Sequence, residues 1–255
     1  PSYLTEWQPL IFIIAGLTML IGVFGSMAVF TLRRVLSFHI VSQVGYMLMG
    51  LGLAGSVDPA VAVFGLAAGI TMMAHNIIVK SALLMASGAA EMEVGSGSLL
   101  RSQLGGLSRR RPALTVLFFI AAMSLAGMPP SSGFVGKLAL LQTAVEGRYW
   151  AIGAVSLLVS FLTLNSMVRL WQKAFWGQPT EPIYPTTPLS RPRSKFLTLA
   201  PIVVLVVLSL GIGIFATPVY RGFTIAAQQA MDREGYIQAV APTDEITFAG
   251  ANHGE

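Results

Sequence analysis

Residues 60–90 of the chain read AVAVFGLAAGITMMAHNIIVKSALLMASGAA. A helix needs about 20 mainly apolar residues to cross the hydrocarbon core of a bilayer, and this stretch is longer than that. It contains Lys80, although an ionisable side chain at the bilayer centre costs about 2.5–3.5 kcal/mol on insertion scales. A second lysine, Lys137, lies in the apolar stretch 133–145, GFVGKLALLQTAV. Ionisable residues inside membrane segments usually mark functional sites, so both lysines are candidates.

The composition of the chain is that of an integral membrane protein. Hydrophobic residues make up 54% of the 255 residues and charged residues 11%, whereas soluble domains carry about 25% charged residues. The mean hydropathy is +0.71. Apolar stretches occupy residues 9–32, 39–56, 60–90, 113–127, 133–145, 149–171 and 196–216. We therefore expect an all-α membrane protein, a bundle of about seven transmembrane helices.

Several classes of chemistry are excluded by what the sequence lacks. The chain has no cysteine, so it has no disulfides, and it has no HExxH motif, phosphate-binding loop or cluster of carboxylates. We expect no cofactor and no metal site. The net charge of +5 indicates loop arginines beside lipid headgroups rather than nucleic-acid binding.

The chain divides into three parts. Residues 1–8 are expected to be a linker, residues 9–217 the transmembrane bundle, and residues 218–255 a polar tail able to form an interfacial helix. There is no initiator Met and no signal peptide, which indicates a piece of a longer protein. With seven separate crossings, Arg33, Arg34 and Arg109–Arg111 would fall on one side of the membrane. The later cluster of Arg191, Arg193 and Lys195 would fall on the other, leaving the orientation open.

A break interrupts the apolar sequence between residues 127 and 133. Neither Pro129 nor Pro130 can donate a backbone hydrogen bond, and Gly133 adds conformational freedom. One interpretation is a tight surface turn between two helices. The alternative is a broken helix at membrane depth, which the shortness of 133–145 favours. A lysine just after such a break is typical of a transporter site.

The two lysines have no acid available in their own segments. All eleven acidic residues lie in connections or tails. In the alternative interpretation each lysine snorkels, with its stem in lipid and its ammonium at the headgroups. Asn76 shares a helix face with Lys80, whereas His75 approaches Lys80 only if the helix bulges or unwinds.

A polar stripe lies in the stretch 39–56, where His39 is followed by Ser42 and Gln43. His39 and Gln43 are one turn apart and share a face. Such stripes join neighbouring helices by hydrogen bonds, or they hydrate a proton path, and the sequence favours neither. Buried lysine and histidine side chains can exchange protons with intervening waters, so a proton path through His75, Lys80 and Lys137 is predicted.

Three stretches together resemble a known family: TLRRVLSFHIVSQVGYMLMGLGL, HNIIVKSALLMASGAAE and GGLSRRRPALTVLFFIAAMSLAGMPPSSGFVGKLALL. They are similar to the second half of the antiporter-like subunits found in Mrp cation/proton antiporters and respiratory complex I. Within this family the chain is most similar to the Mrp D type. The resemblance implies the second of two inverted helical repeats, with Lys80 in its proton channel and Lys137 on its broken helix near the exit. It places His75 on the hydrated central axis, where many relatives have a second histidine and this chain has Asn76.

Three functions follow as hypotheses. The first is a proton-translocating subunit of a multisubunit Na+/H+ antiporter, a secondary transporter rather than an enzyme, in the plasma membrane of a prokaryote. Its expected partners are Mrp subunits of the A, B, C, E, F and G types and the bilayer. Its transported ions are protons and Na+, with K+ or Li+ as alternatives, and nucleic acid is not a partner. The second is a proton-pumping subunit of a complex I-like oxidoreductase or membrane-bound hydrogenase. The third is a structural module whose lysines only pair with neighbours.

Overall fold

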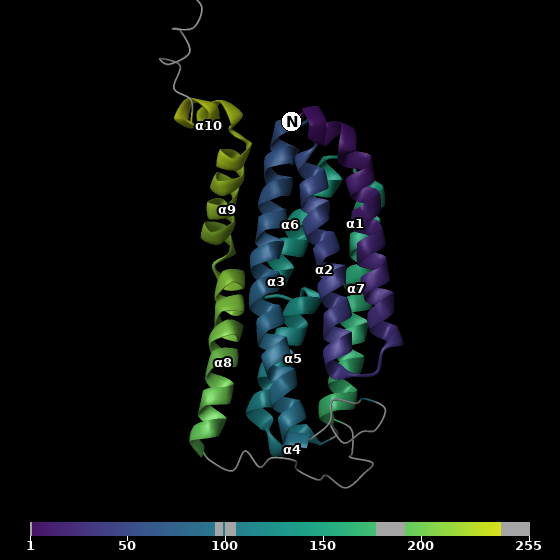
Figure 1. Cartoon of the computed structure of the whole chain (residues 1–255), viewed down its shortest axis with the longest axis vertical. Helices are drawn as coiled ribbons and strands as arrows, with labels where there is room; N and C mark the ends of the chain where they lie inside the picture. The colour runs from purple at the N-terminus through teal and green to yellow at the C-terminus, as the bar shows by residue number, and fades with distance from the viewer. Residues whose placement is uncertain (1, 95–98, 100–105, 177–191, 241–255) are drawn as a thin grey trace, which may run out of the picture.

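The computed structural model describes residues 2–94, 99, 106–176 and 192–240 as a bundle of helices (Figure 1). The helices are α1 (Ser2–Ala28), α2 (Leu32–Ala54), α3 (Pro59–Val94), α4 (Leu107–Arg110), α5 (Pro112–Ala126), α6 (Ser132–Glu146), α7 (Trp150–Trp171), a π turn η2 (Gln172–Trp176), α8 (Pro192–Ile214), α9 (Ala216–Met231) and α10 (Arg233–Val240). Five described helices are long and apolar enough to cross a membrane, namely α1, α2, α3, α7 and α8. The expected all-α membrane bundle is confirmed, and each predicted apolar stretch corresponds to one helix.

Glycines bring the backbones of α1, α2 and α3 close together. Gly50 on α2 faces Gly69 on α3, and a Cβ atom at Gly50 would overlap the Gly69 backbone. Gly22 on α1 faces the backbone of Ser42 on α2 in the same way. Small residues at such crossings let membrane helices pack by van der Waals contact, because lipid provides no hydrophobic drive for their association.

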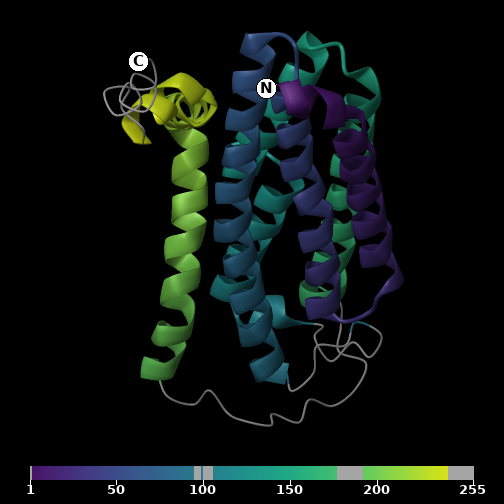
Figure 2. The same ribbon diagram turned by 45° about the horizontal axis from the view of Figure 1, so that its top comes forward.

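Helices α5 and α6 lie end to end and form one broken column (Figures 1 and 2). Each has 15 residues, or about 22 Å at 1.5 Å per residue, so neither is long enough to span alone. Gly133, at the start of α6, lies against the ring of His75, close to the midpoint of α3. The Pro-Pro segment therefore interrupts the column at mid-height of the bundle rather than at one of its ends, with Met128, Pro129 and Pro130 exposed on the side of the column.

The broken column changes the expected orientation of the chain. Because α5 and α6 together run once along the bundle, α8 starts at the same end as α2 and α5 (Figure 1). Arg33, Arg34, Arg109–Arg111, Arg193 and Lys195 therefore lie at one end of the bundle, which we call the basic end. Arg191 lies outside the described residues. The split expected from seven separate crossings is wrong, and the positive-inside rule predicts that the basic end faces the cytoplasm.

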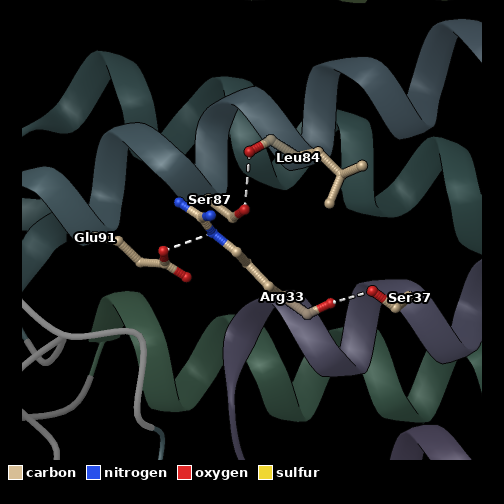
Figure 3. A network of polar contacts seen from close by, with 5 residues as sticks. All are labelled: Arg33, Ser37, Leu84, Ser87 and Glu91. Atoms are coloured by element: carbon tan, nitrogen blue, oxygen red, sulfur yellow. Dashed lines mark hydrogen bonds and ion pairs between the residues drawn. The ribbon is translucent and has the colours of Figure 1, made fainter.

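Two acids lie among these arginines and are paired with them. Arg33 on α2 forms a 2.6 Å ion pair with Glu91 on α3, as Figure 3 shows. Arg111 forms a 2.7 Å ion pair with Glu93. Both carboxylates are thus engaged at the basic end of α3, well away from the lysines within the bundle.

The two ends of the chain differ from a simple linker and tail. Residues 2–8, expected as a linker, are the first turns of α1. In the expected tail, α9 runs upright beside α3 and Tyr220 donates a 3.2 Å hydrogen bond to the Phe64 carbonyl, while α10 lies at an angle to α9 at its far end, to the side of the bundle (Figure 1). Residues 241–255 lie outside the described part of the chain.

We predict the orientation of the membrane topology from the basic end. Arg110→Cys, at the basic end, and Val57→Cys, between α2 and α3 at the opposite end, would each be introduced into a full-length subunit without other cysteines. An impermeant maleimide should label Val57→Cys in intact cells and Arg110→Cys only in everted vesicles. The reverse labelling pattern would contradict the assignment.

Candidate functional site

The break between α5 and α6 presents free carbonyl groups inside the bundle. Gly127 ends α5 with φ of 91°, a left-handed conformation that glycine adopts without strain. The N–H groups of Gly127 and Met128 bond to the carbonyls of Met123 and Ser124. The carbonyls of Leu125 and Ala126 remain available at the C-terminal end of a helix, where the dipole places negative partial charge.

The ammonium group of Lys137 lies at this C-terminal end of α5 and bonds to its free carbonyls. Its Nζ donates to the carbonyls of Leu125 at 3.0 Å and Ala126 at 3.1 Å. The same atom lies 5.0 Å from the centre of the Tyr46 ring, within cation–π range. Lys137 therefore faces a half-helix dipole and an aromatic ring rather than a carboxylate.

Lys80 is also held by backbone. It is 5% exposed, and its Nζ donates a 3.2 Å hydrogen bond to the carbonyl of Leu36 on α2. In the part of the chain that the structure describes, neither lysine forms an ion pair with an acid. Both ammonium groups point into the bundle, so the snorkelling interpretation does not describe their geometry.

His75 belongs to a chain of hydroxyl groups that joins four helices. Its Nδ1 lies 2.8 Å from Ser132 Oγ at the start of α6. Ser132 Oγ lies 2.9 Å from Ser209 Oγ on α8, which lies 2.8 Å from Ser124 Oγ on α5. This chain of hydroxyl groups links both halves of the broken helix to α3 and α8. A Cβ atom at Gly133 would collide with the Ser124 carbonyl and the His75 ring, so the break accepts only glycine there.

His75 and Lys80 do not meet, because α3 is one continuous helix from Pro59 to Val94 without a bulge. Asn76 is buried on α3, and among the described residues neither its Oδ1 nor His75 Nε2 has a hydrogen-bond partner. Both atoms carry unused hydrogen-bonding capacity in the interior.

The polar stripe on α2 lies between the two lysines. The acceptor of Lys80 is Leu36, and the ring beside Lys137 is Tyr46, so the two contacts are about 15 Å apart along α2. Between them His39, Ser42 and Gln43 are fully buried. His39 Nδ1, Ser42 Oγ and both amide atoms of Gln43 have no partner among the described residues. Buried polar atoms of this kind are usually satisfied by ordered water.

Gly133 lies against the His75 ring, but among the described residues the predicted lysines and histidines form no hydrogen bonds with one another. Within the described helices, His39 alone of the stripe bonds across to a neighbour, through Nε2 to Ser166 Oγ on α7 at 2.9 Å. Tyr46, which follows on α2, also bonds to α7 through the Ser156 carbonyl at 2.6 Å. Ser42 and Gln43, which lie between His39 and Tyr46, do not join these helices among the described residues. Sequence reasoning missed Ser124, Ser132 and Ser209, although Ser209 is the only polar residue in the run VVLVVLSLGIGIF.

Buried ammonium groups beside a broken membrane helix are the arrangement found in proteins that move ions across membranes. Residues 2–163 match the family described as "NADH:quinone oxidoreductase/Mrp antiporter, TM". The chain belongs to this family.

Two curated relatives are D-type subunits of Na+/H+ antiporters. The one from Alkalihalophilus pseudofirmus is 40% identical over 91% of this chain and 44% of its own length. The one from Bacillus subtilis is 34% identical over 89% of this chain and 43% of its own. The chain therefore spans less than half the length of these relatives.

Solved structures show the same fold. A chain of the Mrp complex from Dietzia sp. aligns with a TM-score of 0.81 and 33% identity, over 92% of this chain and 49% of that one. A chain of respiratory complex I from Thermus thermophilus aligns with a TM-score of 0.74, over 89% of this chain and 44% of that one. Its 20% identity supports the fold alone.

We predict that the hydroxyl chain stabilises the break. Ser132→Ala would leave His75 Nδ1 buried without its partner, which costs about 1–3 kcal/mol. The full-length subunit should therefore unfold at lower temperature in detergent. Ser81→Ala is the matched control, because Ser81 is exposed on α3 and bonds only to its own helix. Equal melting temperatures for the two variants would contradict the prediction.

Proposed function

We propose that this chain is the second half of a proton-translocating subunit of a multisubunit Na+/H+ antiporter. Protons pass along Lys80, the α2 stripe of His39, Ser42 and Gln43, and Lys137, through intervening waters. His75 and Asn76 contribute to the same hydrated interior. The helix break at Pro129, Pro130 and Gly133 supplies the carbonyls that hold Lys137.

One observation carries this proposal: two ammonium groups within the bundle, Lys80 buried and Lys137 partly buried, lie at either end of a buried stripe of polar atoms that have no partners among the described residues. A purely structural stripe would be bonded across helices, since unsatisfied buried polar groups destabilise a fold. A hydrated stripe satisfies those atoms with water and links the lysines at the same time.

The way the lysines are held suits repeated proton transfer. A carboxylate partner would oppose loss of the proton, because deprotonation would leave an unpaired negative charge in the interior. Neutral carbonyls and an aromatic ring stabilise the ammonium without creating that cost when the amine becomes neutral. Each lysine can therefore gain and lose a proton within one transport cycle.

The relatives support the antiporter over the alternatives. The two antiporter proteins from Alkalihalophilus pseudofirmus and Bacillus subtilis exceed 30% identity across most of this chain. The exchanged cation is proposed as Na+, with K+ or Li+ as alternatives, and the partners as the other Mrp subunits in a prokaryotic plasma membrane. The whole assembly performs the exchange, and this chain supplies part of the proton route.

A complex I-like role is the second candidate. A relative named as the N-type subunit of NADH-quinone oxidoreductase, from Hirschia baltica, is 33% identical over 70% of this chain and 36% of its own length. Co-purification separates the two functions, because the redox complex would bring iron–sulfur and quinone-binding proteins, whereas the antiporter would bring small hydrophobic subunits.

The sharpest test changes Lys137 in the full-length subunit within its complex. Lys137→Ala should lower sodium-driven proton movement in everted vesicles by about 100-fold, the lower end of what a positioned proton-transfer group contributes. Lys137→Arg should fail as well, because arginine keeps the positive charge but does not release its proton.

The arginine variant separates proton transfer from a structural role. If Lys137 only neutralises the carbonyl end of α5, then Lys137→Arg should restore both assembly and transport. Arg34→Ala, an exposed residue at the basic end, serves as the control that should transport normally. Normal proton movement by an assembled Lys137→Arg complex would contradict the proposal.

A further inference from the structure

A pocket opens at the basic end between the last turns of α1 and α7. Its volume is about 130 Å³, and its lining includes Ser26, Val29, Phe30, Ser166, Arg169 and Lys173. At about 30 Å³ per molecule this space holds roughly four waters. Arg169 and Lys173 lie at its mouth, whereas Ser26 and Ser166 are buried at its inner wall.

The inner wall of this pocket is bonded to the polar stripe. Ser26 Oγ lies 3.3 Å from Ser166 Oγ, and Ser166 Oγ lies 2.9 Å from His39 Nε2. Ser166 therefore contacts the pocket on one side and the imidazole ring on the other. The hydrogen bonds lead from the surface of the basic end to the first residue of the stripe.

The two nitrogens of His39 face different environments. Nε2 is bonded to the pocket wall, while Nδ1 is buried without a partner in the described part of the chain. Ser42 and Gln43, which follow on the same face of α2, also carry unpartnered buried atoms there. The fully buried ring is thus the boundary between the pocket and the interior.

We propose that this pocket is a proton inlet from the basic end into the stripe, and that His39 is its relay. The inference rests on the proposed proton path and adds a route by which protons reach it. A hydronium ion in the pocket protonates the Ser166 hydroxyl as that hydroxyl passes its own proton to Nε2, which forms the imidazolium and leaves a neutral water. Nδ1 then releases a proton to water beside Ser42, so one proton moves inward. A reorientation of the ring, which turns the unprotonated nitrogen back towards Ser166, resets the relay.

The charged groups that face His39 from the described helices are all cationic. Lys80 and Lys137 act on the ring electrostatically from the interior, and Arg169 and Lys173 lie at the mouth of the pocket. Like charges destabilise the imidazolium, so the ring gives up its proton again quickly, as a relay must. A proton moves along the hydrogen bonds from Ser166 to His39 by transfer, which a metal cation cannot do, so the inlet selects for protons.

A cysteine accessibility experiment tests the inlet in the full-length subunit within its complex. Ser166→Cys, in a background without other cysteines, should react with a charged methanethiosulfonate added at the basic end. Proton transport should then be lost, and a reducing agent should restore it. Ser156→Cys is the matched control, since Ser156 is an equally buried serine on α7 that does not line this pocket, and it should resist the reagent.

A second variant blocks the pocket without touching its hydrogen bonds. Val29→Trp should fill the space and lower proton transport, while Val57→Trp, at the opposite end of the bundle, should leave it unchanged. The inlet is refuted if Ser166→Cys reacts only after denaturation, if its modification leaves transport intact, or if assembled Val29→Trp transports normally. These outcomes leave the proton path standing as long as Lys137→Arg is inactive. If Lys137→Arg transports normally, the proposed function fails instead.

Discussion

The contact between the Lys137 ammonium and the carbonyl end of α5 is the interaction on which the site depends. A charge inside a membrane bundle needs a partner, and the described helices offer no acid to this lysine. The break supplies one by stopping α5 at Gly127 and leaving the carbonyls of Leu125 and Ala126 free. In an unbroken helix those carbonyls would accept hydrogen bonds from the following turn. The break therefore provides the hydrogen-bond acceptors that Lys137 needs.

The break must itself be held, because irregular backbone at membrane depth is stable only when its polar groups find partners within the protein. Ser124, Ser132 and Ser209 form the hydroxyl chain that joins the two half-helices to α8, and Ser132 extends it to His75 on α3. Gly213 lets the end of α8 approach the backbone of Pro130. Helix α8 thus packs against the break and bonds to both half-helices, although it carries none of the ionisable residues of the site.

Helix α2 connects the parts of the site, since it provides the acceptor of Lys80, the ring beside Lys137 and the stripe between them. Its glycines permit close packing against α1 and α3, which leaves the polar side chains enclosed rather than facing lipid. His39 extends the stripe through Ser166 towards the basic end. The hydrogen bonds of His39 thus point from the stripe towards the basic end of the bundle.

The sequence by itself determined the all-α membrane class, the positions of the apolar helices, the two anomalous lysines and the residues of the break. These follow from local hydropathy and from proline chemistry, which act within one segment. The tertiary structure alone decided that 113–127 and 133–145 form one column, that the arginine clusters share one end, and that Ser132 and Ser209 support His75. It also decided which atoms of Ser42 and Gln43 lack partners among the described residues. Such facts depend on contacts between residues far apart in the chain, because burial and hydrogen bonding are set by the helices that pack together and not by local sequence.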